Sequence, residues 1–107
     1  MKMTEVTMVR IYLSEKESHL DSLLQRLHDW EKLRGVTVFR GISGYGDSGH
    51  LHTASFTDLS MDLPLVLEFF DEPAKIEKIL EHLNNTIKSM HMVKWNAWVN
   101  DIEDESL

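Results

Sequence analysis

Four apolar runs and two helical stripes alternate along this chain of 107 residues, and their order limits the folds open to it. Runs rich in β-branched and aromatic residues, typical of strands, occupy residues 6–13, 36–42, 63–70 and 91–99. A stripe of leucines at helical spacing separates the first two runs, and a stripe of isoleucines and leucines separates the last two. The predicted order of elements is therefore β-α-β-β-α-β.

Each helical stripe is expected to pack against a sheet. The first stripe comprises Leu20, Leu23, Leu24, Leu27, Trp30 and Leu33. Gly35 stands where a glycine commonly follows the last turn of a helix, which predicts that this helix ends near Arg34. The second helix is predicted to begin at Asp71-Glu72-Pro73, because proline is well tolerated in the first turn. Its stripe comprises Ile76, Ile79, Leu80, Leu83, Ile87 and Met90.

This order predicts an α+β fold of the ferredoxin-like kind, with a four-stranded antiparallel sheet and both helices on one face. Residues 1–107 are expected to form a single domain. The second face of the sheet then needs cover, since it is expected to present Phe39, Phe69 or Phe70, Trp95 and Trp98. Self-association would supply that cover. Arg10 interrupts the first strand, and we interpret it as a side chain that either extends from a sheet face or is paired.

The segment between the second and third strands is far longer than an ordinary hairpin connection. Residues 43–62 are polar and rich in glycine, and such long loops on compact scaffolds commonly carry function. Glycines at 41, 44, 46 and 49 can expose backbone N–H groups as a concave site for an anion. Alternatively, they serve only the geometry of the loop exit. Arg40 can supply a cation for an anionic ligand, or it can form a salt bridge with Glu68.

Charge and composition exclude several classes of function. The chain has 11 Lys and Arg against 18 Asp and Glu, a formal charge of −7, which argues against nucleic-acid binding and against adsorption to an anionic membrane. Part of the excess lies in an acidic tail, residues 100–107. Absence of cysteine excludes disulfides and thiolate ligands. Neither a signal-peptide pattern nor a membrane-spanning apolar run is visible, so a cytoplasmic location is expected.

The loop and its flanks resemble a known family. The matching segments are TVFRGISGYG at residues 37–46, HTA at 52–54 and LSMDLP at 59–64. Tyr12-Leu13 with Glu15 and His19, and Asp71 with Lys75-Ile76-Glu77, fit the same pattern. These segments resemble the PII-like family known as domain of unknown function 190, over about residues 9–83. More distantly, the chain is similar to the PII nitrogen-regulatory signalling proteins.

The resemblance to PII proteins implies a trimer with nucleotides bound in clefts between subunits. Gly44-Tyr45-Gly46 stands where PII proteins have Gly-Phe-Gly at the base of their long loop. Beyond it, Asp47 and Ser48 replace the basic and glutamine residues of PII proteins. Residues 101–105 are acidic, where PII proteins carry arginines. The resemblance therefore favours the trimer more than it favours binding of a triphosphate.

The leading hypothesis is a regulatory protein that binds a small anionic ligand, with an adenine nucleotide as the candidate, and contacts a target protein through the 43–62 loop. By analogy the target is a membrane transporter or a metabolic enzyme. Neither membrane insertion nor a catalytic role is expected. The ligand wall would comprise Arg40, Gly41, Gly44, Tyr45 and Gly46, and the partner-reading part of the loop Ser48, His50, His52 and Thr53.

Two alternatives remain open. A metal-binding trimer of the CutA-like kind would use His50, His52 and His19, because His-x-His on a strand places two imidazoles on one face. A small enzyme at the subunit interface would use His52 with Ser60 or Asp62, but no nucleophile-elbow pattern accompanies Ser60.

Overall fold

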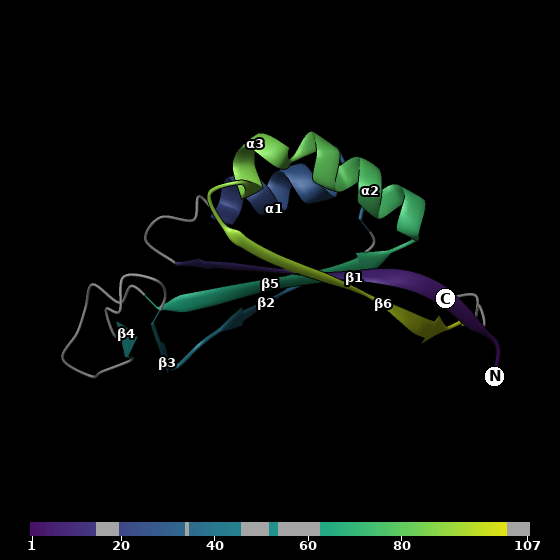
Figure 1. Ribbon diagram of the computed structural model, residues 1–107, viewed down its shortest axis with the longest axis horizontal. Helices are drawn as coiled ribbons and strands as arrows, with labels where there is room; N and C mark the ends of the chain where they lie inside the picture. The colour runs from purple at the N-terminus through teal and green to yellow at the C-terminus, as the bar shows by residue number, and fades with distance from the viewer. Residues whose placement is uncertain (15–19, 34, 46–51, 54–62, 103–107) are drawn as a thin grey trace.

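The computed structural model describes residues 1–14, 20–33, 35–45, 52–53 and 63–102 (Figure 1). Three elements form the first half of the fold, namely β1 (Met3–Ser14), α1 (Leu20–Asp29) and β2 (Val36–Arg40). Two short strands follow, β3 (Ser43–Gly44) and β4 (His52–Thr53). The second half comprises β5 (Pro64–Asp71), α2 (Pro73–His82), α3 (Asn84–Ile87) and β6 (His91–Asn100).

Four strands form one antiparallel sheet in the order β2-β5-β1-β6, and the helices cover one of its faces (Figure 1). This arrangement confirms the predicted ferredoxin-like βαββαβ sandwich. The two termini lie at the same end of the sheet (Figure 1), where the Asp101 amide donates to the Lys2 carbonyl at 2.9 Å. In the part of the chain that the structure describes, no helix is long and apolar enough to cross a membrane.

Strand alternation decides which side chains enter the core. Val9 and Ile11 of β1, with Leu67 and Phe69 of β5, are almost fully buried and join the same cluster as the helices. The helices contribute the predicted leucine and isoleucine stripes, including Leu23, Leu27, Ile76, Ile79 and Leu83. Phe69 is therefore a core residue, whereas its neighbour Phe70 lies on the other face.

The prediction that α1 reaches Arg34 with Gly35 beyond it is wrong, because the helix ends at Asp29. The Glu31 amide bonds to the Arg26 carbonyl at 3.1 Å, and Lys32 takes a left-handed conformation with φ of 57°. This turn brings Leu33 into the core, with 5% of its surface exposed. Trp30, predicted to belong to the buried stripe, is instead 80% exposed.

Two further predictions need correction. The second strand ends at Arg40 and not at residue 42. The Gly41 amide still bonds to the Pro64 carbonyl at 2.7 Å, but proline has no N–H to return that bond, so the ladder stops there. Trp98 does not lie on the uncovered face of the sheet. It is four residues from Lys94, which forms an ion pair with Glu77 of α2, so alternation places both β6 side chains on the helix side.

Candidate functional site

The base of the long loop is built where β2 ends beside the start of β5. Arg40 is the last residue of β2, and the Gly41 amide that follows donates to the Pro64 carbonyl at 2.7 Å. A Cβ atom at Gly41 would lie 2.7 Å from Cγ of the Pro64 ring, and one at Gly44 would lie 3.3 Å from it. Both glycines therefore pack closely on this ring, which holds the loop base in place.

This packing bears on the two roles considered for the glycines. At Gly41 the close approach to Pro64 explains the need for glycine, and the amide is already engaged in the fold. Any amide donor for an anion would therefore come from beyond Gly41. Tyr45, a further described member of the predicted ligand wall, is 75% exposed. Gly46 lies outside the described residues, and a role for this set remains a prediction.

A short ladder joins the start of the loop to its middle. Ser43 pairs with Thr53 and Gly44 pairs with His52 in the β3-β4 ribbon. The backbone of two predicted partner-loop residues therefore lies directly beside the predicted ligand wall. The other two, Ser48 and His50, lie outside the described residues. The start of the long loop is thus held in two ways, by packing on Pro64 and by this ribbon.

The metal-site hypothesis involves residues that the structure describes only in part. His19 and His50 are outside the described residues, and only the backbone of His52 is described. Among the described side chains, no group of three His, Cys, Asp or Glu residues is placed to hold a metal ion. The CutA-like alternative and the enzyme alternative at Ser60 or Asp62 therefore stay as predictions.

Glu68 does not pair with Arg40, as one alternative proposed. Glu68 stands opposite Thr37 in the ladder and Arg40 stands opposite Leu65, so the two side chains leave the sheet on different faces. The partner of Glu68 is Arg10, whose Nε lies 3.1 Å and whose Nη2 lies 2.5 Å from Oε1. The proximity of this carboxylate raises the pKa of Arg10 above its already high ordinary value.

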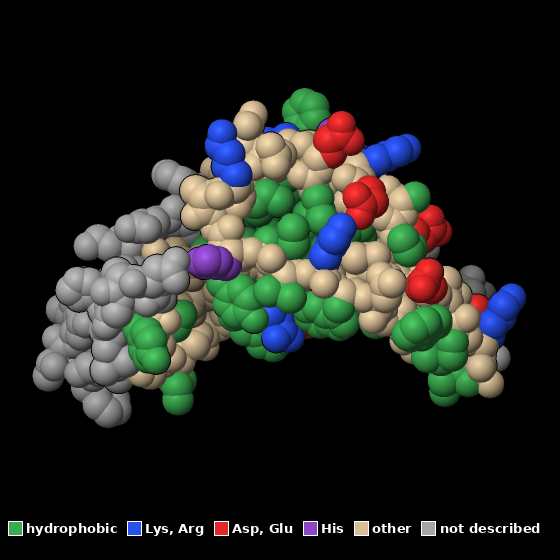
Figure 2. Space-filling model, in the orientation of Figure 1, with side chains coloured by type: hydrophobic (Ala, Val, Ile, Leu, Met, Phe, Trp, Pro, Cys, Tyr) green, Lys and Arg blue, Asp and Glu red, His purple; other side chains and the backbone are tan. Residues whose placement is uncertain are grey.

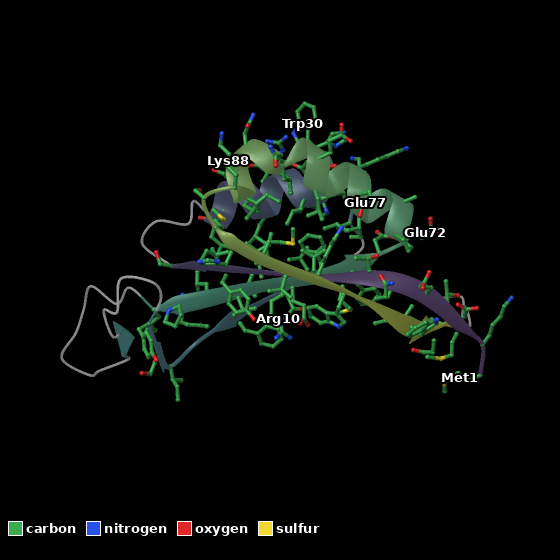
Figure 3. All side chains as sticks on the ribbon, in the orientation of Figure 1. Met1, Arg10, Trp30, Glu72, Glu77 and Lys88 are labelled. Carbon is green, nitrogen blue, oxygen red and sulfur yellow. The ribbon has the colours of Figure 1, made fainter. Side chains whose placement is uncertain are left out.

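The Arg10–Glu68 pair lies in the middle of the sheet face that no described helix covers (Figure 3). The Arg10 guanidinium also stands 5.4 Å from the centre of the Trp95 ring, within the range of a cation–π contact. Apolar side chains surround the pair, and Figure 2 shows a row of them along this underside of the sheet. Those exposed by 38–50% are Tyr12, Phe39, Phe70, Val93 and Trp95. We call this surface the open sheet face.

Sequence reasoning missed two functional features. The first is the packing of the loop base on Pro64. The sequence offered one signal for it, a proline at the start of a strand that pairs beside Gly41. The second is the identity of the partner of Arg10. Arg10 and Glu68 are 58 residues apart, and only the strand register shows that they face each other.

Sequence comparisons identify a family and relatives of this chain. The model of the family DUF190, described as "Uncharacterized ACR", matches residues 6–99. A UPF0166 protein of Aquifex aeolicus is 35% identical over 88 residues, which cover 78% of this chain and 83% of the relative. A UPF0166 protein of Methanocaldococcus jannaschii is 30% identical over 99 residues, which cover 85% and 87%.

Comparisons of structure find the same fold in PII-like proteins. CPII of Thiomonas intermedia K12, bound to ADP and bicarbonate, superposes with a TM-score of 0.67 at 16% identity, covering 92% of this chain and 91% of CPII. CPII bound to ADP, AMP and bicarbonate, a nitrogen regulatory PII-like protein, gives 0.69 at 15% identity with the same coverage. At such identities the likeness concerns the fold, which agrees with the predicted class.

Proposed function

This chain belongs to the DUF190 family, and from that membership and the PII-like fold we propose that it is a PII-like regulatory protein. It acts as a homotrimer that binds a small anionic ligand in the clefts between subunits. Ligand binding changes the state of the 43–62 loop, and the loop contacts a target protein. The chain is proposed to act by binding, without a catalytic role.

The open sheet face supports assembly into a trimer. A surface with five large apolar side chains exposed by 38–50% gains free energy when a second copy covers it. The Arg10–Glu68 pair in its middle is already matched within one chain, so a partner can cover it without leaving a lone charge buried. In an assembly formed through this face, the edge of the sheet and the loop base lie next to a neighbouring subunit.

The observation that carries the proposal is the construction of the loop base. A long segment leaves the edge strand β2 at Arg40 and returns at Pro64, and the Gly41–Pro64 hydrogen bond holds its two ends together, while the β3-β4 ladder ties residues 43–44 to residues 52–53. A rigid base under a long polar loop suits a device in which a ligand at the base selects one state of the loop. Part of the free energy of ligand binding then offsets the conformational entropy that the loop loses when it becomes ordered.

An adenine nucleotide is the proposed ligand class. Structures of CPII with the same fold hold ADP, AMP and bicarbonate, and this chain offers Arg40, at the end of its edge strand, as a cation for a phosphate group. Tyr45, which is 75% exposed near the base, offers a ring for stacking on the adenine. The target is proposed to be a transporter or a metabolic enzyme, by analogy with PII proteins.

Calorimetric titration with ATP, ADP, AMP and cyclic AMP, each with and without bicarbonate, tests this proposal, with light scattering on the same sample. We expect a trimer that binds one of these nucleotides with micromolar affinity. Arg40→Ala should weaken binding at least tenfold, because a charge-assisted contact to phosphate is lost. Lys78→Ala, which removes an exposed cation on α2, is the matched control and should bind as the wild type does.

Each outcome bears on a separate part of the proposal. A trimer that binds none of these compounds retains the assembly and rejects the nucleotide. A monomer rejects the subunit cleft altogether. Equal binding by Arg40→Ala and Lys78→Ala would move the site away from the loop base.

A further inference from the structure

Trp30 is the most exposed large aromatic side chain in the part of the chain that the structure describes. It follows directly after α1, and 80% of its surface is accessible. Figure 3 shows its ring standing out from the helix layer, on the side away from the sheet. An indole can bury roughly 150–250 Å² in a contact, so a tryptophan held in water at the end of a helix leaves a large apolar surface unused.

Trp30 stands over an open groove between α1 and the end of α2. The groove has a volume of about 550 Å³ and is lined by Ser22, Gln25, Arg26, Trp30, Glu31 and His82. Ser22, Arg26 and Trp30 follow one another at intervals of four residues, and the Trp30 amide bonds to the Arg26 carbonyl at 3.0 Å. They therefore form one outward stripe of α1, with His82 of α2 across from it.

Among the residues that line the groove, the exposed charge is that of Arg26. Arg26 donates through Nη2 to the His82 carbonyl at 2.9 Å, so its charge faces a neutral acceptor. The one carboxylate of the groove, Glu31, is only 7% exposed and lies 3.0 Å from Nδ1 of His82. Its charge is turned inward, while the guanidinium and the imidazole lie at the surface. Arg26 is thus an exposed cation beside an exposed indole.

We propose that Trp30, Arg26 and His82 form a docking surface for an acidic protein segment, in which an apolar side chain flanked by carboxylates packs on the indole. Tryptophan and arginine are the residue types that most often dominate the binding free energy of protein interfaces. A carboxylate can accept two parallel hydrogen bonds from a guanidinium, and the Arg26–His82 carbonyl contact holds that guanidinium in place.

Other occupants fit less well. A small ligand normally has most of its surface buried, but five of the six lining residues are exposed and the groove is open. A second copy joined by a twofold axis through the groove would bring two exposed Arg26 guanidiniums into one small patch, where Glu31, only 7% exposed, offers them little opposite charge. A nucleic acid needs several clustered cations to neutralise its phosphates, and the residues that line the groove include one arginine and no lysine.

This surface goes beyond the proposed function, because it lies on the helix layer, whereas the loop base and the open sheet face belong to the sheet (Figure 1). If subunits meet through the sheet, the helix layer of every subunit faces outward. An assembly would then present several identical grooves, and a target could be held at two kinds of site at once.

A peptide-display selection on the full-length protein tests the inference. A library of random twelve-residue peptides is selected on the wild type after depletion on Trp30→Ala, and enriched peptides are synthesised and measured by fluorescence anisotropy. We expect peptides with an apolar residue next to Asp or Glu. Their affinity should fall at least tenfold in Trp30→Ala and at least threefold in Arg26→Gln, and should weaken as salt rises from 0.05 to 0.5 M.

Trp98→Ala, which removes an indole that is 60% exposed elsewhere, is the matched control and should bind the peptides as the wild type does. Thermal melting of each variant checks folding, and Trp30→Ala should have the melting temperature of the wild type. If Trp30→Ala melts at a lower temperature, Trp30→Gln is used in its place. Failure to enrich any peptide, enrichment of peptides without acidic residues, or equal loss in Trp98→Ala would overturn the inference. Self-association that depends on Trp30 would assign the groove to a second copy and overturn it also. Nucleotide binding plays no part in these measurements, so the two proposals can fail separately.

Discussion

Replacing Gly41 by alanine tests the loop base directly. The new Cβ would lie 2.7 Å from Cγ of Pro64 and 3.3 Å from its carbonyl oxygen. Carbon atoms in ordinary contact stand about 3.5–4.0 Å apart, so the overlap is roughly 1 Å. Because the Gly41 amide is also bonded to the Pro64 carbonyl, the strands cannot separate without losing that hydrogen bond. The expected cost is about 1–3 kcal/mol of unfolding free energy, the usual range for overpacking.

Urea denaturation at one fixed protein concentration measures this cost, since the stability of an oligomer depends on concentration. Thermal melting should agree, with a fall of about 4 °C or more. Gly35→Ala is the matched control, because nothing lies within 4 Å of the added Cβ and its backbone does not require glycine. That variant should be unchanged or stabilised by about 0.4–1 kcal/mol through the unfolded chain. Gly44→Ala, at 3.3 Å from the ring, should fall between the two.

A second change separates the clash from other effects of alanine. Pro64→Ala removes the ring atom that Gly41→Ala meets, so the double variant should recover part of the lost stability. Coupling between neighbouring residues of this kind is about 0.5–3 kcal/mol. Equal stability of Gly41→Ala and Gly35→Ala, or simple additivity with Pro64→Ala, would refute the view that the loop rests on this proline.

Two further predictions address the helix layer and the open sheet face. His82→Ala should lower the unfolding free energy by about 1–3 kcal/mol, because the Glu31 side chain is only 7% exposed and loses its partner. His28→Ala, which removes one member of an exposed pair, is the control and should change the unfolding free energy by less than about 0.5 kcal/mol. Equal effects of the two changes in urea denaturation would contradict the contact between His82 and Glu31. Trp95→Glu should convert the proposed trimer into monomers in light scattering, since it places a charge in the open sheet face, whereas Trp98→Glu on the helix side should not; a trimer retained by both would mean that subunits meet elsewhere.

Much of the fold was predictable because its signals are local. The apolar runs and the two helical stripes were enough to place four strands and two helices in order, and the proline at the start of α2 was correctly read. The end of α1 was not predictable from Gly35. A glycine marks where a left-handed residue is easy, but here Lys32 takes that conformation, and Lys75 of α2 donates to its carbonyl at 2.9 Å. Tertiary contacts therefore decided the helix end.

The candidate site was predictable only as a stretch of chain. Its described residues follow from the end of β2 and pack beside the start of β5, but the pairing of charges depended on register. Arg40 and Glu68 lie on adjacent strands and looked compatible, yet a three-residue offset puts them on opposite faces. The sequence contains no local signal for that offset. The Glu68 carboxylate pairs instead with Arg10 of β1, the strand on the other side of β5.

The three tryptophans show what hydrophobic patterning can and cannot determine. Trp95 and Trp98 are three residues apart on one strand, so the period of two already required opposite faces, and the prediction that both lie on the open sheet face disregarded it. Trp30 is different, because its spacing fits the buried stripe and only the early end of α1 removes it from the core. Helical spacing predicts which side of a helix a residue faces, and that prediction applies only as far as the helix continues. A large apolar residue just past a helix end is therefore where a predicted core position can become a surface. At Trp30 this surface lies beside an arginine and a histidine, and that neighbourhood leads us to interpret it as a binding surface.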